Sequence, residues 1–186
     1  GACFTEDEEI ADISRSFGAE VPFLRDNSYD DHSPVSDAST RALIQAEIYW
    51  NTEYDNIVQL MANCPLRSSD EIIQFHDYFI SGEHDFLISC FKFGWINPWW
   101  AFKFDDKENH EFIFPNNLGS RSQDLPQLYC PTGSIWMARS KLLKETKSFY
   151  GENQKFKEID WISSIDIDDY DDLFIAKKIA LTKLRK

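Results

Sequence analysis

The chain has 186 residues, of which 42% are hydrophobic and 15% aromatic, and its formal net charge is −13. This composition excludes intrinsic disorder and is enough for one domain with a sizeable core. The negative charge disfavours nucleic acid and anionic membranes as partners, because phosphate groups attract clustered Lys and Arg. No apolar run is long enough to span a membrane and no signal peptide opens the sequence, so we expect a cytoplasmic protein.

The first half of the chain predicts helices that alternate with short apolar segments. Thr5 opens a capping-box pattern before a helical run, with Ile10, Ile13 and Phe17 as its apolar stripe and Gly18 as its stop. The elements expected next are a polar loop over 27–34, a helix over 37–50, a strand over 56–61, a helix opened by a second capping box at 68–71, and a strand over 85–93.

The second half predicts more strands than helices. An irregular stretch over about 94–119 contains two short strand candidates around a polar turn. Strands that alternate with helices indicate an α/β protein, and the irregular stretch favours a mixed sheet with helices on both faces and a small β-rich excursion. The remaining expectations are a strand over 134–138, a short helix over 141–146, a strand over 163–168 and an amphipathic helix over 169–184.

The cysteines are widely scattered and form no CxxC pair. This disfavours a zinc site or a disulfide framework, and we interpret them as buried free thiols. The histidines also lie far apart, so none is assigned a ligand role. The cysteines stand at Cys3, Cys64, Cys90 and Cys130.

The sharpest chemical signal is the segment Ile165–Asp168. Side chains alternate between the faces of a strand, so Asp166 and Asp168 would point the same way. Two carboxylates at this spacing suit a hard cation such as Mg²⁺, with positions left for water and phosphate oxygens. The alternative is that Asp168 or Asp169 only caps the last helix and the other acids are solvated. Residue types alone do not decide between these interpretations.

Two polar loops carry an arginine beside a predicted strand. The loop Asn63–Ser69 joins a strand end to a helix start, which is where ligands bind in open α/β sheets. Arg67 in this loop could meet a carboxylate or a phosphate, and the alternative is a surface salt bridge. Arg121 lies in a similar loop and is a weak signal by itself.

Aromatic residues gather in and beside the irregular stretch. We interpret this cluster as core or as a subunit interface, and a sugar-stacking platform is the less favoured alternative. Its members are Phe91, Phe93, Trp95, Trp99, Trp100, Phe102 and Phe104.

Five segments follow one known pattern in the same order along the chain. Thr5–Ala11 resembles S-T-D-D-E-E-I-A, Gly18–Arg25 resembles G-A-E-V-P-F-L-R-P, Pro65–Arg67 resembles the end of Q-P-T-S-P-L-R, Arg121–Gly133 resembles R-x-Q-D-L-P-x-x-Y-x-P-N-G-A, and Ile165–Asp168 resembles I-D-I-D. Together they resemble the acylneuraminate cytidylyltransferase family, whose members make CMP-activated sialic and related nonulosonic acids.

The resemblance implies a nucleotide-diphospho-sugar transferase-like (Rossmann-like) α/β fold, with a homodimer contact through the excursion. It implies a nucleotidyltransferase that converts CTP and an acidic 2-keto sugar to a CMP-sugar and pyrophosphate, with Mg²⁺ as cofactor. By this match, Asp166 and Asp168 are the catalytic, metal-binding residues. Arg121 and Gln123 would face the sugar acid, because Arg suits a carboxylate. The nucleotide-binding residues would be Arg25, Asn63, Pro65 and Arg67.

The chain also departs from the family pattern. The family opens with a strand and a basic, Gly-rich loop that cradles the triphosphate, and this sequence contains no such segment. We therefore expect weak or no CTP binding and an exposed sheet edge in this chain alone, unless another chain supplies that part. Residues 61–64 replace Q-P-T-S, and Thr132 replaces the Asn before Gly133. Because the Gln of that motif helps to read the sugar, the identity of the acidic sugar stays open.

Two other functions stay open at this point. The first is a non-catalytic, truncated remnant or assembly module of the same fold. The second is a DxD-type glycosyltransferase, which would place its acidic pair early or in the middle of the chain. Asp166 and Asp168 lie near the end of this one.

Overall fold

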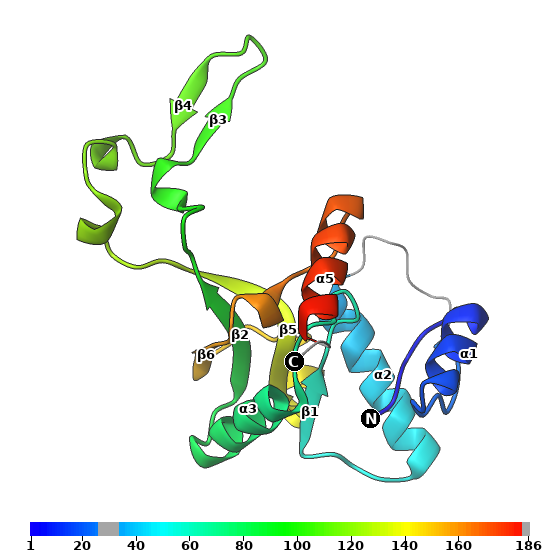
Figure 1. The fold of residues 1–186 in the computed structure, drawn as a ribbon. Coiled ribbons are helices and arrows are strands. Elements are labelled where there is room, and N and C mark those ends of the chain that lie inside the picture. The colour runs from blue at the N-terminus through cyan, green and yellow to red at the C-terminus, as the bar shows by residue number, and fades with distance from the viewer. Residues whose placement is uncertain (26–33, 184–186) are drawn as a thin grey trace. The chain divides into compact units, whose positions relative to one another are not determined.

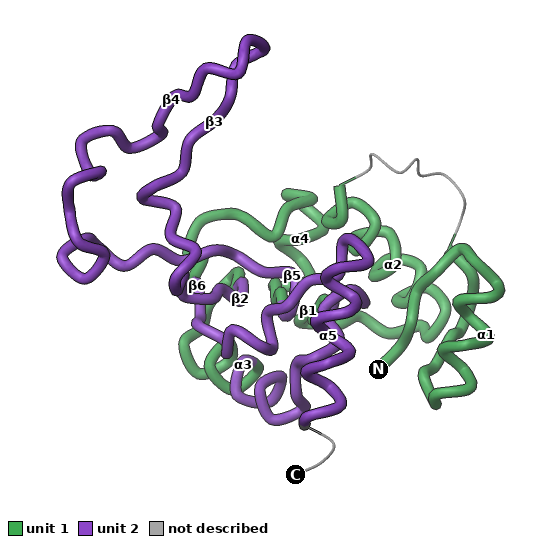
Figure 2. Tube along the Cα trace, turned by 45° about the horizontal axis from the view of Figure 1, so that its top comes forward, with its two compact units in different colours: residues 1–59, 76–87, 136–155 green, residues 60–75, 88–135, 156–186 purple. Residues whose placement is uncertain are grey.

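The protein is described by a computed structural model that covers residues 1–25 and 34–183. Most of the polar loop predicted over 27–34, and residue 184 of the predicted last helix, lie outside the described residues. The chain forms two compact units, each assembled from separate stretches (Figure 2). Unit 1 consists of residues 1–59, 76–87 and 136–155, and unit 2 consists of residues 60–75, 88–135 and 156–186. The prediction of a single domain over 1–186 stays a prediction.

A four-stranded sheet with the order β1-β5-β2-β6 is the central element (Figure 1). Strands β1 and β5 pair antiparallel, with Asn56 opposite Arg139. The predicted α/β fold with a mixed sheet is confirmed. Strand β6 was not predicted, because all but one of its residues are polar; most of its side chains are exposed in the structure. The strands are β1 (Asn56–Gln59), β2 (Phe86–Lys92), β5 (Tyr129–Arg139) and β6 (Gln154–Glu158).

The first helix, α1 (Glu8–Ser16), begins two residues later than the capping-box pattern indicates. Asp7 caps it by accepting a hydrogen bond from the Ile10 amide at 3.0 Å, whereas Thr5 binds the Asp7 amide instead. The predicted apolar stripe is also wrong as a buried face, because Ile10, Ile13 and Phe17 are exposed.

Helices α2 (Val35–Trp50) and α4 (Ser140–Thr146) pack together in unit 1, and α4 also contacts β1. The Lys144 ammonium lies 2.9 Å from the Glu47 carboxylate, which joins the two helices by an ion pair. Ala42 and Ala46 are buried, as their helical spacing predicts. Helix α2 begins at Val35, before the expected Asp37, and has no side-chain cap.

Helix α3 (Ser69–Ser81) begins at the second predicted capping box. The Ser68 hydroxyl accepts a hydrogen bond from the Glu71 amide at 3.2 Å, and the Glu71 carboxylate accepts one from the Ser68 amide at 2.7 Å. These reciprocal bonds satisfy two backbone donors that a helix start leaves unpaired. The helix buries Phe75 and Phe79, as predicted.

The strand predicted over 163–168 is absent from the described structure. A 3₁₀ turn over Ile162–Ser164 stands there, and residues 165–169 after it have no regular secondary structure. Asp160 accepts a hydrogen bond from the Ile162 amide, and the Ser164 hydroxyl donates to the Trp161 carbonyl. Short polar side chains that bond to nearby backbone compete with a strand ladder, and this explains the error.

Helix α5 (Tyr170–Lys183) buries or half-buries Leu173, Ala176, Ile179 and Ala180, as predicted. It is less one-sided than the predicted amphipathic helix, because Phe174, Ile175 and Leu181 are exposed. None of the helices in the described ranges combines the length and apolar character that crossing a membrane would require. All four cysteines are free, as predicted, but only Cys64 and Cys90 are buried.

An extended excursion over residues 93–128, here named the arm, connects β2 to β5 within unit 2 (Figures 1 and 2). It carries the antiparallel strands β3 (Phe102–Phe104) and β4 (His110–Phe112), close to the two strands predicted there. The Phe93 amide donates to the Leu128 carbonyl at 3.1 Å, which closes the base of the arm. Most of its side chains are exposed.

We expect Ser68→Ala to lower the free energy of unfolding by about 1 kcal/mol, because it removes the cap of α3. Urea denaturation measures this change. Ser69→Ala is the matched control, since Ser69 is exposed and lies one residue inside the helix. Equal stability of the two variants would contradict the capping role of Ser68.

Candidate functional site

Two segments of unit 2 that are far apart in the sequence meet at the candidate site. One is residues 61–67, here named the 61–67 loop, and the other is residues 165–169, here named the acidic segment. The Ile167 amide donates to the Asn63 carbonyl at 3.0 Å. The Cys64 thiol donates to Oδ1 of Asp166 at 3.5 Å, across 102 residues of sequence. These contacts bring the predicted residues Asn63, Pro65, Arg67, Asp166 and Asp168 onto two adjoining segments.

Arg67 stabilises the 61–67 loop from within. Its Nη1 donates to the Met61 carbonyl at 2.7 Å and to the Cys64 carbonyl at 2.6 Å. Burial lowers the pKa of the Arg67 guanidinium from its usual value. These contacts are to backbone oxygens, and the described residues give Arg67 no carboxylate partner, which disfavours the surface salt bridge. Its role in nucleotide binding stays a prediction.

The two acids of the candidate metal motif are both accessible. Exposure alternates along the acidic segment, since Ile165 and Ile167 are half-buried whereas Asp166 and Asp168 are exposed. The segment is not a strand, but this alternation is the one expected of extended backbone. Within the described ranges, neither carboxylate pairs with Lys or Arg. Both therefore retain oxygen atoms for a ligand.

Other acids cap the last helix. Oδ1 of Asp169 accepts hydrogen bonds from the amides of Asp171 and Asp172 at 2.8 and 2.9 Å. Oδ2 of Asp172 in turn accepts from the amides of Asp168 and Asp169 at 3.1 and 3.2 Å. This reciprocal arrangement is a capping box built from two aspartates. The capping alternative therefore applies to Asp169 and Asp172, and the carboxylates of Asp166 and Asp168 take no part in it.

Asp166 and Asp168 suit an open Mg²⁺ site better than a metal site closed by protein ligands alone. Among the described residues, no group of three or more His, Cys, Asp or Glu side chains is arranged to hold a metal. Proteins commonly bind Mg²⁺ through one or two carboxylates, and water and substrate phosphates complete the shell. Asp166 and Asp168 offer this kind of open, all-oxygen donor set.

Buried hydroxyl groups hold the turn that precedes the acidic segment. The Ser134 hydroxyl on β5 donates to the Ser163 carbonyl at 3.0 Å, and the Thr132 hydroxyl donates to the Ser164 carbonyl at 3.3 Å. From β2, the Ser89 hydroxyl donates to the Thr132 carbonyl at 3.0 Å. No sequence pattern predicts this network, and the only signal in the sequence is a set of small hydroxyl residues inside otherwise apolar segments.

Cys64 is a further residue of the site that the sequence motifs do not identify. Its side chain is fully buried, with 0% exposure. Burial, and after it the neighbouring Asp166 carboxylate, raises the pKa of the Cys64 thiol to about 11. The thiol is therefore neutral at physiological pH and keeps its proton for the hydrogen bond to Asp166.

Three predicted residues lie on other parts of the chain. Arg25 belongs to unit 1, where its Nε donates to Glu6 at 3.0 Å and lowers the pKa of that carboxyl group. Arg121 and Gln123 lie on the arm and are exposed. Arg121 makes two hydrogen bonds to the carboxylate of Asp124, at 2.7 and 3.1 Å. The contacts around the acidic segment include none of the three.

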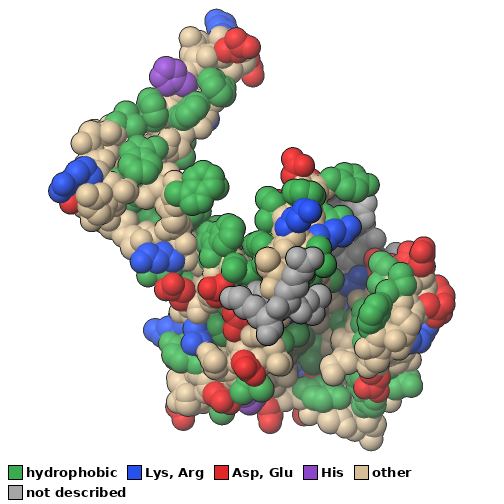
Figure 3. All heavy atoms as spheres, in the orientation of Figure 1, with side chains coloured by type: hydrophobic (Ala, Val, Ile, Leu, Met, Phe, Trp, Pro, Cys, Tyr) green, Lys and Arg blue, Asp and Glu red, His purple; other side chains and the backbone are tan. Residues whose placement is uncertain are grey.

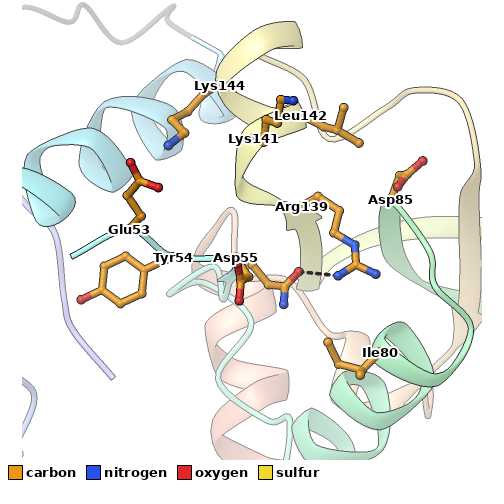
Figure 4. A pocket seen from close by; sticks show the side chains of 10 residues that line it. Glu53, Tyr54, Asp55, Ile80, Asp85, Arg139, Lys141, Leu142 and Lys144 are labelled. Atoms are coloured by element: carbon orange, nitrogen blue, oxygen red, sulfur yellow. Dashed lines mark hydrogen bonds between the residues drawn. The ribbon is translucent and has the colours of Figure 1, made fainter.

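Unit 1 contains a cavity of about 770 Å³ at the end of β5, between α3 and α4 (Figure 4). Arg139 lies in its wall and donates to the Asn56 side chain at 3.3 Å. Both acidic and basic side chains line the cavity, among them Asp85 and Lys141. No residue predicted to bind nucleotide, sugar or metal lines it, so we assign it no role.

No family model matches the chain. Among curated proteins, it is 28% identical over 174 residues to pseudaminic acid cytidylyltransferase of Campylobacter jejuni, an alignment that covers 93% of this chain and 74% of the relative. It is also 28% identical over 187 residues to CMP-N,N'-diacetyllegionaminic acid synthase of Legionella pneumophila, covering 94% and 75% of the two chains. The resemblance to CMP-sugar-acid synthases inferred from the motifs is confirmed.

Solved structures agree on the fold. CMP:2-keto-3-deoxy-manno-octonic acid synthetase complexed with CTP superposes with a TM-score of 0.65 at 12% identity, over 97% of this chain and 80% of the other. 4-Diphosphocytidyl-2C-methyl-D-erythritol synthase of Anaerococcus prevotii superposes with a TM-score of 0.58, also at 12% identity, over 94% and 76%. Both neighbours are named as cytidylyl-type enzymes, and the predicted fold class is confirmed.

We expect Asp169→Ala to lower the free energy of unfolding by about 1 kcal/mol, because Asp169 caps α5. Asp168→Ala removes the same charge without removing a cap, so its effect should stay within about 0.5 kcal/mol. Chemical denaturation of both variants checks the difference. If Asp168→Ala were the more destabilising change, the assignment of the capping role to Asp169 would be wrong.

Proposed function

We propose that this chain, a homologue of the pseudaminic and legionaminic acid CMP-synthases, is a cytidylyltransferase that activates a nonulosonic-type 2-keto sugar acid with CTP. One observation carries the proposal. The 61–67 loop and the acidic segment, which hold most of the predicted site residues, are bonded to each other in a chain whose named relative aligns over 93% of its length. Because the reaction consumes CTP, we also propose a cytoplasmic location.

The proposed reaction is a nucleotidyl transfer. The anomeric hydroxyl oxygen of the sugar acid forms a new bond to the α-phosphorus of CTP. The bond from that phosphorus to the bridging oxygen breaks, and pyrophosphate leaves with the electron pair while the hydroxyl proton passes to solvent. Positioning and electrostatic stabilisation contribute most of the catalysis in such transfers.

We propose Asp166 and Asp168 as the residues that hold Mg²⁺. Their exposure on alternate residues of the acidic segment, and the absence of a described Lys or Arg beside them, support this role. When bound, the ion would supply positive charge beside the phosphate oxygens, where negative charge develops. Oδ1 of Asp166 accepts a hydrogen bond from the Cys64 thiol, which leaves Oδ2 of that carboxylate available.

The nucleotide side of the site is proposed to involve the 61–67 loop. Arg67 makes the loop rigid through two backbone contacts, and Asn63 and Pro65 lie on the same short stretch. A loop fixed in this way can present its backbone and side chains to a ligand without paying for its ordering at the moment of binding. Arg25 is proposed as a further contact by its position in the matching segment.

The sugar acid is proposed to meet Arg121 and Gln123 on the arm. Arg121 is highly exposed, and its planar guanidinium already binds one carboxylate, that of Asp124, through two parallel bonds. The same geometry suits the carboxylate of a sugar acid, which could take the place of Asp124.

The acceptor is proposed to be a nonulosonic acid other than sialic acid itself. The relatives are named for pseudaminic and diacetyllegionaminic acids. Where the family pattern has Gln, this chain has Met61, whose thioether packs over Gly133 so closely that a Cβ at that glycine would lie 2.3 Å from the sulfur. An apolar side chain there cannot donate the hydrogen bonds of a glutamine amide.

A homodimer through the arm is part of the proposal. Large apolar side chains are exposed along it, and Figure 3 shows hydrophobic atoms on its surface. A patch of this kind on a soluble protein commonly marks a contact with another chain, and we propose that its partner is a second copy. The exposed apolar residues are Trp95, Ile96, Phe102, Phe104, Ile113 and Leu118.

We expect the full-length gene product that contains this sequence to release pyrophosphate from CTP and Mg²⁺ when given pseudaminic or legionaminic acid. Asp168→Asn should lower that rate by about a hundredfold or more, because it removes a metal-binding carboxylate. A coupled pyrophosphate assay over a panel of 2-keto sugar acids measures both.

Asp171→Asn is the matched control, since Asp171 is an exposed acid of the same run whose carboxylate makes no described contact. Its rate should stay within about twofold of the unmodified protein. Absence of pyrophosphate release with every acid of the panel would overturn the proposed function.

We expect Phe104→Asp to weaken self-association by about tenfold or more, because it places a charge in the proposed apolar contact. Sedimentation equilibrium measures the dissociation constant. Phe174→Asp is the control, because Phe174 on α5 is exposed to a similar degree, 61% against 67% for Phe104. A protein that is monomeric before substitution would contradict the proposed dimer.

A further inference from the structure

Cys64 lies at the centre of a buried contact between three parts of unit 2. Its thiol donates to Oδ1 of Asp166 at 3.5 Å. The Thr132 side chain, from β5, lies close to the same thiol, and its hydroxyl donates to the Ser164 carbonyl at 3.3 Å. Cys64 is 0% exposed and Thr132 only 7%. The thiol therefore connects the 61–67 loop, β5 and the acidic segment.

The acidic segment and the residue before it are held at three nearby points. The Ser164 carbonyl accepts from Thr132, the Asp166 carboxylate accepts from Cys64, and the Ile167 amide donates to Asn63. Asp168 follows directly and is exposed. Backbone fixed on both sides of Asp166 leaves that carboxylate little freedom apart from its own side-chain rotation.

We propose that Cys64 and Thr132 form a buried latch that positions Asp166 for its ligand. Both are positioning residues, because they act through Asp166. The latch itself is a matter of contacts within the chain, and only its consequence for metal binding rests on the proposed function.

The chemistry of the thiol suits this role. The fully buried Cys64 thiol donates to Oδ1 of Asp166 at 3.5 Å and so directs that oxygen inward. The other oxygen is then left for a cation, and hydrogen bonds of this kind orient ligating carboxylates in metal sites. Cys64 and Thr132 are also two of the positions where this chain departs from the family pattern. Both departures fall on one contact, as expected if the two residues act together.

Hydrogen exchange of the Ile167 amide tests the latch without any metal. We expect Cys64→Ala to speed this exchange by about tenfold, because the segment opens locally more often. Thr132→Val, which keeps the side-chain volume, should have an effect in the same direction. Cys64→Ser should restore slow exchange, because a hydroxyl also donates to Asp166.

The controls remove equivalent groups elsewhere. Cys90→Ala removes a buried thiol from β2, and Thr40→Val removes a buried hydroxyl from α2. Neither should change exchange at Ile167. If Cys64→Ala and Thr132→Val leave exchange at Ile167 as slow as in these controls, there is no latch and the inference is wrong.

Binding of Mn²⁺ alone, followed by electron paramagnetic resonance, tests the consequence. The dissociation constant should rise by about 10- to 100-fold in Cys64→Ala and recover in Cys64→Ser. Unchanged Mn²⁺ affinity in a variant with fast exchange would overturn the positioning role. Absence of Mn²⁺ binding to the unmodified protein would instead contradict the metal site of the proposed function, and the exchange data would still decide whether the latch exists.

Discussion

The contacts that join the 61–67 loop to the acidic segment are the constraint on which the candidate site depends. One is the Ile167 amide to the Asn63 carbonyl, and the other is the Cys64 thiol to Asp166. Without them, Asp166 and Asp168 would be two members of an exposed acidic run. With them, the acids stand beside a loop made rigid by Arg67. Backbone donors and acceptors that are buried must find partners, and here the pairing also assembles the site.

The acidic run divides into two roles that its sequence does not separate. Asp169 and Asp172 point back at backbone amides and begin α5, whereas Asp166 and Asp168 face solvent. Carboxylates crowded in this way repel one another, and the proposed divalent cation would relieve that repulsion at the two that remain accessible. The helix start thus fixes the backbone next to the proposed metal-binding residues.

Charge sets a further requirement on the proposed reaction. The chain carries a net charge of −13, and both CTP and a sugar acid are anions. The general field of the protein therefore opposes substrate binding, and local positive groups must overcome it. In the proposal, two positive groups of unit 2 lie beside the substrates. They are Arg121, which is exposed on the arm, and the cation held by the two aspartates.

The sequence by itself determined the α/β class, the capping box of α3, the strands of the arm and the family resemblance, because these rest on local patterns and on ordered motifs. It misplaced the start of α1 and predicted a strand over 163–168, where Asp160 and Ser164 bond to nearby backbone instead. It also could not assign Cys64 and Thr132 to the site. Only the tertiary structure decided that, because a buried thiol gains its role from a partner 102 residues away, and no local pattern records such a contact.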